Sequence, residues 1–90
     1  MAEEFVLTGV GSPMWQREPK FFWRYFRVIG DDTLYVEDLR MKGTEYQDEY
    51  PYVWYINQGD EHSARSMSEA KGCAEMAQSV QESFRREQGK

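Results

Sequence analysis

Side chains that commonly perform catalysis are scarce in this chain of 90 residues. His62 is its only histidine and Cys73 its only cysteine, so a nucleophile–base pair would need both. Cys73, however, falls on the apolar stripe of an expected helix, where a thiol packs as a small apolar group. His62 follows Asp60 and Glu61 in an expected hairpin and is interpreted as a solvated turn residue. The sequence therefore predicts no nucleophilic catalyst.

Metal, carboxylate and phosphate chemistry lack their usual sequence signatures as well. A zinc site needs a cysteine pair or further histidines, a calcium loop needs spaced aspartates, and neither pattern occurs. The acidic pairs Asp31–Asp32 and Glu37–Asp38 are adjacent, and adjacent residues of a strand point to opposite faces. The sequence has no glycine-rich phosphate loop. We therefore expect no metal, no cofactor and no enzymatic activity.

Aromatic side chains are the strongest candidates for a binding role. Residues 21–28 are dominated by aromatic rings and predict a strand with large side chains on both faces. One helix covers only one side of a sheet, so the second aromatic face must meet a loop, another subunit or a partner. The alternation places Phe22, Phe26 and Val28 on one face and Phe21, Trp23 and Tyr25 on the other. The first set lacks hydroxyl and indole groups, so it is the set expected to face the core.

The elements that must position these rings follow from local patterns along the chain. Turn signals at residues 30–32 and 58–60 separate strands without intervening helices, which favours antiparallel pairing. Residues 41–43 are expected to form a turn or bulge. The fold class is α+β: an antiparallel four- to five-stranded β-meander with one C-terminal helix on one face. The expected strands are 21–29, 33–39, 45–50, 52–57 and 61–65, with residues 1–13 either flexible or an edge strand.

The C-terminal helix is expected over residues 67–87. Ser66 and Glu69 match a capping box, and apolar residues follow at steps of three and four. Gly72 either marks a close contact with the sheet or is a tolerated surface glycine. The expected buried stripe consists of Ala70, Cys73, Ala74, Ala77, Val80 and Phe84.

Size and charge limit the class of protein. Residues 1–90 are long enough for a single domain, and no apolar run approaches a membrane span. The chain start lacks the pattern of a signal peptide, which makes a cytoplasmic location the expectation. The net charge of −5 argues against duplex nucleic acid as a partner. The acidic residues concentrated in 31–61 either fill solvated turns or form a surface that docks on a basic site.

Residues 53–57, 62–71 and 74–75 resemble the strand–hairpin–strand–capped-helix ending of many small phage and prophage proteins. A chain of this size and acidity also resembles phage-encoded inhibitors of host machinery, including anti-CRISPR proteins. The resemblance implies a non-enzymatic protein that acts by occupying a surface, in the host bacterial cytoplasm if it is phage-encoded. It carries over no functional residue.

The first hypothesis for function is therefore a small protein-binding inhibitor or adaptor that occupies a site on a larger defence or nucleic-acid-processing complex, such as a CRISPR effector. A second hypothesis is a single-strand nucleic-acid-binding sheet, with bases stacked on Trp23, Tyr25 and Trp54 beside Arg24 and Arg27. A third is a homodimeric structural protein that associates through the same face. The residues expected to contact a partner are Trp23, Arg24, Tyr25, Arg27, Asp31, Asp32, Asp48, Glu49, Tyr52, Trp54, Asp60 and Glu61.

Overall fold

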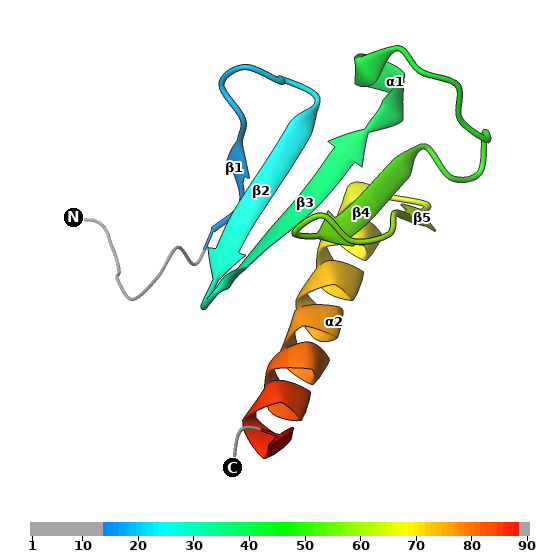
Figure 1. The fold of residues 1–90 in the computed structure, drawn as a ribbon. Helices are drawn as coiled ribbons and strands as arrows, with labels where there is room; N and C mark the ends of the chain where they lie inside the picture. The colour runs from blue at the N-terminus through cyan, green and yellow to red at the C-terminus, as the bar shows by residue number, and fades with distance from the viewer. Residues whose placement is uncertain (1–13, 89–90) are drawn as a thin grey trace.

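A five-stranded antiparallel sheet with a C-terminal helix across one face forms the protein (Figure 1). The computed structural model describes residues 14–88, so the expectation for residues 1–13 lies outside the described residues. Each strand pairs with the next one along the chain, in the order β1-β2-β3-β4-β5, which confirms the expected α+β meander. The elements are β1 (Gln16–Arg17), β2 (Arg24–Ile29), β3 (Asp32–Asp38), α1 (Leu39–Lys42), β4 (Tyr52–Ile56), β5 (His62–Ala64) and α2 (Met67–Gln88).

The aromatic run enters the sheet later than its composition predicts. Strand β2 begins at Arg24, whereas residues 21–23 lie in a turn that the Arg24 N–H closes by donating to the Phe21 carbonyl at 2.8 Å. The rings of Phe21 and Phe22 each lie 5.4 Å from the ring of Trp23. The expectation of strand structure from residue 21 is therefore wrong, because this aromatic cluster and the turn bond compete with a continued ladder.

The connection between β3 and β4 contains no further strand. Helix α1 begins after Asp38, whose carboxylate accepts the Arg40 N–H at 3.0 Å, and it ends at Gly43, whose φ is 85°. Glycine adopts that left-handed conformation without steric cost, which explains the end of the helix. The strand expected at 45–50 is wrong: its backbone forms only the isolated bridge between Gln47 and Tyr50. The fifth strand is instead β1, which pairs Gln16–Arg17 with β2.

Helix α2 is capped as expected and packs through small residues. Ser66 Oγ accepts the Glu69 N–H at 3.1 Å, and the Glu69 carboxylate accepts the Arg65 N–H at 3.0 Å. Ala70 and Ala74 are fully buried, which allows the helix to lie close to the sheet. They contact Val36 and Leu34, the fully buried apolar residues of β3, and these contacts form the centre of the core; the last turns of α2 extend past the sheet (Figure 1).

The buried face of α2 differs from the predicted stripe. Cys73 is exposed, and the exposed fractions of Val80 and Phe84 are 63% and 59%, so the expectation that these three residues are core is wrong. Gln78 is instead buried on the side of α2 that faces the sheet, with an exposed fraction of 3%. The sheet below offers polar partners, including Asp32 and the Ile29 carbonyl, so a polar helix residue is satisfied there.

The choice of the buried sheet face also differs from the prediction. Tyr25 and Arg27 of β2 register opposite Val36 and Leu34, which places them on the side that α2 covers. The expected core set Phe22, Phe26 and Val28 is therefore wrong: Phe22 precedes the strand and Val28 is 40% exposed on the other side.

The polar groups of the half-buried side chains on the helix side have hydrogen-bond partners, so their polarity does not prevent them from lying there. Arg17 Nη2 donates to the Tyr25 hydroxyl at 2.7 Å. Glu75 of α2 accepts both the Trp15 indole N–H at 2.8 Å and the Arg27 guanidinium at 2.6 Å. Burial of a polar side chain costs little free energy once its donors and acceptors are paired.

None of the helices within residues 14–88 combines the length and the apolar character needed to cross a membrane.

Candidate functional site

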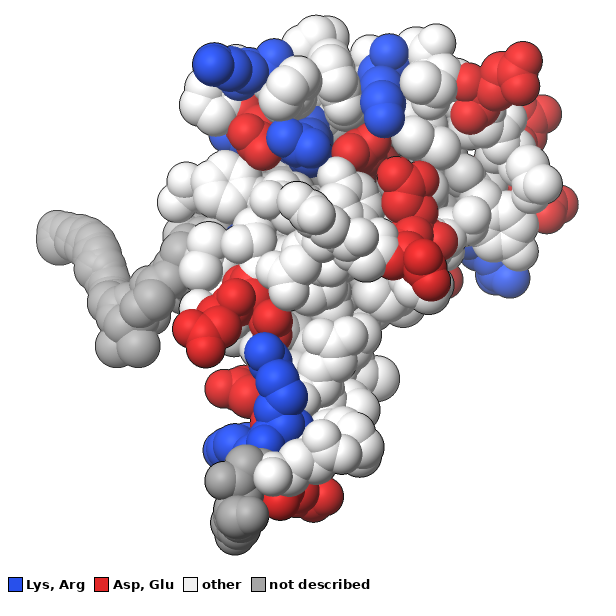
Figure 2. Space-filling model, viewed as in Figure 1, with Lys and Arg blue, Asp and Glu red and all other residues white. Residues whose placement is uncertain are grey.

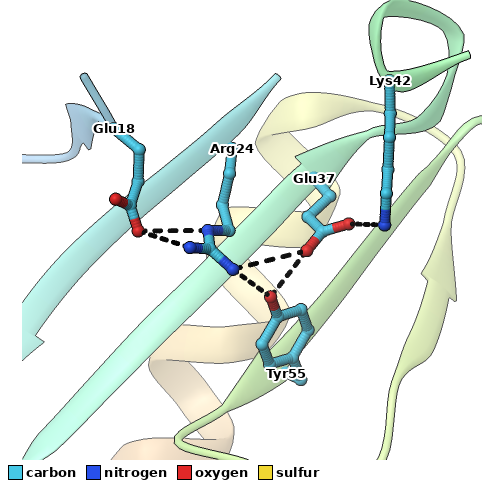
Figure 3. Close-up of polar contacts among 5 residues, drawn as sticks. All are labelled: Glu18, Arg24, Glu37, Lys42 and Tyr55. Atoms are coloured by element: carbon cyan, nitrogen blue, oxygen red, sulfur yellow. Dashed lines mark hydrogen bonds and ion pairs between the residues drawn. The ribbon is translucent and has the colours of Figure 1, made fainter. Parts of the chain in front are cut away.

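The sheet face that α2 leaves uncovered is the best candidate site, and we call it the open face. Strand alternation and register place its side chains. Figure 1 shows α2 behind the sheet, and Figure 3 shows part of the open face in front of it. The open face consists of Arg24, Phe26, Val28, Thr33, Tyr35, Glu37, Val53 and Tyr55, together with Phe21 of the preceding turn, over whose ring Arg24 lies, and we group the adjacent exposed Phe22 with it.

A buried carboxylate lies at the centre of the polar contacts on this face. The Glu37 side chain is only 5% exposed. Its Oε2 accepts the Tyr55 hydroxyl at 2.6 Å, and its Oε1 accepts Lys42 Nζ at 2.9 Å (Figure 3). Arg24 Nη1 lies 4.0 Å from the same Oε2. Both carboxylate oxygens are therefore paired, which is the condition under which a buried charge is tolerated.

Arg24 joins this carboxylate to the aromatic rings around it. Its guanidinium lies 2.8 Å from the Glu18 carboxylate and donates to the Tyr55 hydroxyl at 3.4 Å. The guanidinium carbon also lies 4.7 Å from the Phe21 ring centroid and 5.1 Å from that of Tyr35, distances at which cation–π attraction operates. Tyr35 stacks on Tyr55 with ring centroids 5.0 Å apart. Adjacent strands thus present a fixed aromatic and guanidinium surface.

The protonation states of these groups follow from their surroundings. Burial raises the pKa of the Tyr55 phenol, and its hydrogen bond to Glu37 raises that pKa further. Burial alone would lower the pKa of Arg24, but its hydrogen bond to Tyr55 and its contact with Glu18 outweigh burial and raise it. Tyr55 therefore stays a neutral donor and Arg24 stays a cation at neutral pH. Neither of these two side chains changes charge across the physiological range.

Apolar side chains surround this fixed centre and reach solvent. Phe22, Val28 and Phe21 have exposed fractions of 49%, 40% and 39%. A shallow hollow of about 380 Å³ lies beside the stacked tyrosines. Its lining residues are Arg24, Tyr35, Tyr55, Asn57, Gln58, Gly59 and Glu61.

Acidic side chains lie at the margins of the open face. Figure 2, drawn from the same side as Figure 1, shows Asp and Glu side chains over the α1–β4 connection, and Lys and Arg side chains along the top of the same view. Asp48, Glu49, Asp60 and Glu61 are all exposed, as is Asp31 at the β2–β3 turn. The acidic residues of the expected partner set therefore accompany turns, with one exception: Asp32 is buried, with an exposed fraction of 2%.

The aromatic part of the expected set is divided between the two faces. Tyr25, Tyr52 and Trp54 lie on the helix side and pack against the core clusters or α2 residues. Trp54 also stacks on His62, which belongs to β5 rather than to a turn, with ring centroids 4.4 Å apart. The base-stacking platform described from the sequence is therefore not assembled on one free face. From that set, Arg24 lies on the open face, Trp23 lies in the turn that precedes β2, and Arg27 donates to Glu75 of α2 on the helix side.

The residues at the centre of the open face were missed by sequence reasoning. Tyr35, Glu37 and Tyr55 alternate with the buried Leu34, Val36 and Ile56. That period-2 alternation was the available signal, since it assigns all three to the face opposite the core.

No protein-family model, curated protein or solved structure matches this chain. Across residues 14–88, no group of three or more His, Cys, Asp or Glu side chains is placed to hold one metal ion. We therefore infer function from the side chains of the open face themselves.

Proposed function

We propose that this chain is a small non-enzymatic inhibitor or adaptor whose open face docks on a larger protein complex. The observation that carries the proposal is the exposed apolar set Phe21, Phe22 and Val28 beside the fixed Arg24–Tyr35–Tyr55 group. Aromatic and arginine side chains dominate the energetics of protein interfaces.

Rigidity supports binding as the role of this face. Side chains that are already ordered lose less conformational entropy on association, and this raises affinity for a given contact area. The Tyr55 hydroxyl donates to Glu37 Oε2 at 2.6 Å, and Arg24 Nη2 forms an ion pair with Glu18 Oε2 at 2.8 Å. A partner would therefore meet a preformed surface.

The acidic margins favour a partner with a basic site. Asp48 and Glu49 lie on one margin, and Asp60 and Glu61 on another. Complementary charge at the rim of an interface increases association rate and specificity. A nucleic-acid channel of a host nucleoprotein complex has this basic character. The phage origin, the likeness to anti-CRISPR proteins and the bacterial cytoplasmic location remain predictions of the same proposal.

Affinity capture followed by a binding titration tests this proposal. The tagged parent is incubated with bacterial lysate, bound proteins are identified by mass spectrometry, and the purified partner is titrated by calorimetry. The test variant is Phe22→Ser/Val28→Ser, since both side chains are exposed and neither belongs to the core clusters. The matched control is Met41→Ser/Tyr46→Ser, which removes apolar side chains of similar exposure, 42% and 40%, from the β3–β4 connection.

The proposal expects at least roughly tenfold weaker binding for the open-face variant and unchanged binding for the control. Equal affinity of both variants and the parent would exclude the open face as the docking surface. A parent that captures and titrates no partner would overturn the proposal as a whole.

A further inference from the structure

The outer side of α2 carries a second apolar surface, which we call the outer stripe. It consists of Cys73, Met76, Val80 and Phe84, spaced three or four residues apart and therefore on one helical face. The exposed fractions of Met76, Val80 and Phe84 are 71%, 63% and 59%. Apolar side chains this exposed and this regularly spaced are typical of a helix that has a packing partner on two sides.

A hollow lies near the outer stripe, on the side of Ala77 and Gln81. A cavity of about 120 Å³ lies where α2 meets β4 and the β4–β5 connection. Ala77 and Gln81 line this cavity from the helix, Trp54, Ile56 and His62 line it from the sheet, and Gly59 and Asp60 line it from the β4–β5 connection. The cavity is therefore mixed in character, and a second helix laid along the stripe would lie beside it.

Among the residues of α2, charge is absent beside the middle of the outer stripe and present at its two ends; Asp60, at the adjoining cavity, belongs to the β4–β5 connection. Ser79, Gln81 and Ser83 flank the stripe near Val80 and are uncharged. Glu69 lies on the same side one turn before Cys73, and Glu87 one turn after Phe84. A chain with a net charge of −5 repels its own copies over most of its surface, so an uncharged apolar centre is where two copies can approach.

We propose that two copies of this chain form a dimer through their outer stripes, with the α2 helices antiparallel and crossing near Val80. A parallel pair would place Glu69 against Glu69 and Glu87 against Glu87 of the second copy, which costs free energy. In the antiparallel pair Glu87 lies near Cys73 of the other copy, and the helix dipoles oppose one another. The arrangement is isologous, as in most dimers.

The dimer leaves the open face accessible on each copy, because α2 packs on the opposite side of the sheet. It therefore stands independently of the proposed function. One helix pair buries an area at the lower end of the range for specific interfaces, so the expected dissociation constant is on the order of micromolar.

Sedimentation equilibrium over roughly 1 to 200 µM chain, which brackets a micromolar constant, is the first test. The parent should rise from the 10.7 kDa of one chain toward twice that mass. Val80→Glu should remain at the single-chain mass, and Met41→Glu, at an exposed site away from α2, should dimerise like the parent. Circular dichroism checks that each variant is folded. A parent that stays at the mass of one chain, or a Val80→Glu variant that still dimerises, would overturn the proposal.

Thiol crosslinking tests the antiparallel direction. The two Cys73 side chains would lie about 21 Å apart along the helix axis, from twice seven residues at about 1.5 Å each, whereas the two residues at position 80 would be neighbours. A bis-maleimide that reaches less than two helical turns should crosslink Val80→Cys in a Cys73→Ser background. The same reagent should leave the parent uncrosslinked. Faster crosslinking of the parent than of the variant would contradict the antiparallel arrangement.

Discussion

Arg85, near the end of the C-terminal helix, binds the carboxylate of Asp32, the buried first residue of β3. Arg85 Nη2 lies 2.5 Å from Asp32 Oδ2. Gln78 donates to the same oxygen at 3.3 Å, and Asn57 donates to Oδ1 at 3.0 Å. A single carboxylate therefore joins the β2–β3 hairpin, the end of β4 and the far half of α2.

Asp32 makes the protein sensitive to acid. Burial alone would raise the pKa of this carboxyl, but its hydrogen bonds from Asn57, Arg85 and Gln78 outweigh burial and lower it. The unfolded chain, with a carboxyl pKa of about 3.9, then binds a proton more readily than the folded protein. The stabilisation is present above that pH and is lost as the pH falls through the lowered folded value.

Asp32→Asn tests this dependence. At pH 7 the variant should lose about 2–4 kcal/mol of unfolding free energy, because the donors of Arg85 and Gln78 lose their charged acceptor. Below about pH 4 the difference from the parent should shrink progressively, since the unfolded parent then takes up a proton that the folded parent, with its lowered pKa, does not yet bind. Urea unfolding followed by tryptophan fluorescence at both pH values measures the gap. A gap of constant size would contradict the assignment.

Tyr55→Phe tests the hydrogen bond at the centre of the open face. The substitution leaves Glu37, which is 5% exposed, without its 2.6 Å donor, and should cost about 1–2 kcal/mol of unfolding free energy. Tyr46→Phe, at an exposed tyrosine of the β3–β4 connection, should cost close to nothing. Because the pKa of Tyr55 is raised, its contribution is present below about pH 10 and declines at higher pH. Equal urea midpoints for the two variants would refute this role for Tyr55.

Two glycines should respond to alanine with opposite signs. Nothing lies within 4 Å of a Cβ added at Gly72 in the exposed middle of α2, so Gly72→Ala should stabilise the fold by about 0.5–1 kcal/mol. Gly43 ends α1 at a φ of 85°, where alanine is strained, so Gly43→Ala should destabilise the fold by about 1 kcal/mol. Thermal unfolding of both variants beside the parent measures the shifts. A fall in melting temperature for Gly72→Ala would show that this position needs glycine after all.

Ser66→Ala tests the start of α2. The variant removes the oxygen that accepts the Glu69 N–H at 3.1 Å and should cost about 1 kcal/mol. Ser79→Ala, at an exposed position within the same helix, should instead stabilise slightly because alanine has the higher helix propensity. Urea unfolding of both variants separates the cap from a general effect of serine removal, and equal shifts would argue against the cap.

The parts of the fold that local pattern determines could be predicted from the sequence. Strand β3 follows the alternation around Leu34 and Val36, and α2 begins where Ser66 and Glu69 indicate. The sequence signal was strong at these positions because propensity, period and capping residues all favour the same element.

The faces of the elements could not be predicted in the same way. Tyr25 is half-buried on the helix side, where Arg17 donates to its hydroxyl, and Gln78 is buried, where Asp32 accepts from its amide. The partner of Gln78 lies 46 positions away in sequence, and neither partner can be identified from the residue alone, so counting the polar atoms of one residue assigns these side chains to the surface. The candidate site was misplaced for this reason: Trp54 was assigned to the free face, whereas Tyr55 next to it lies there.

The meander topology has a kinetic consequence. Because each strand pairs with its immediate neighbour in the chain, the sheet closes only short loops, and such local contacts favour rapid formation. The contacts that span the chain belong to α2, as in Trp15 with Glu75 across 60 positions and Asp32 with Arg85 across 53. Docking of α2 on the sheet is then the folding step with the largest loss of chain conformational entropy. Substitutions at Ala70 or Ala74 should consequently alter the folding rate more than those in the hairpin turns.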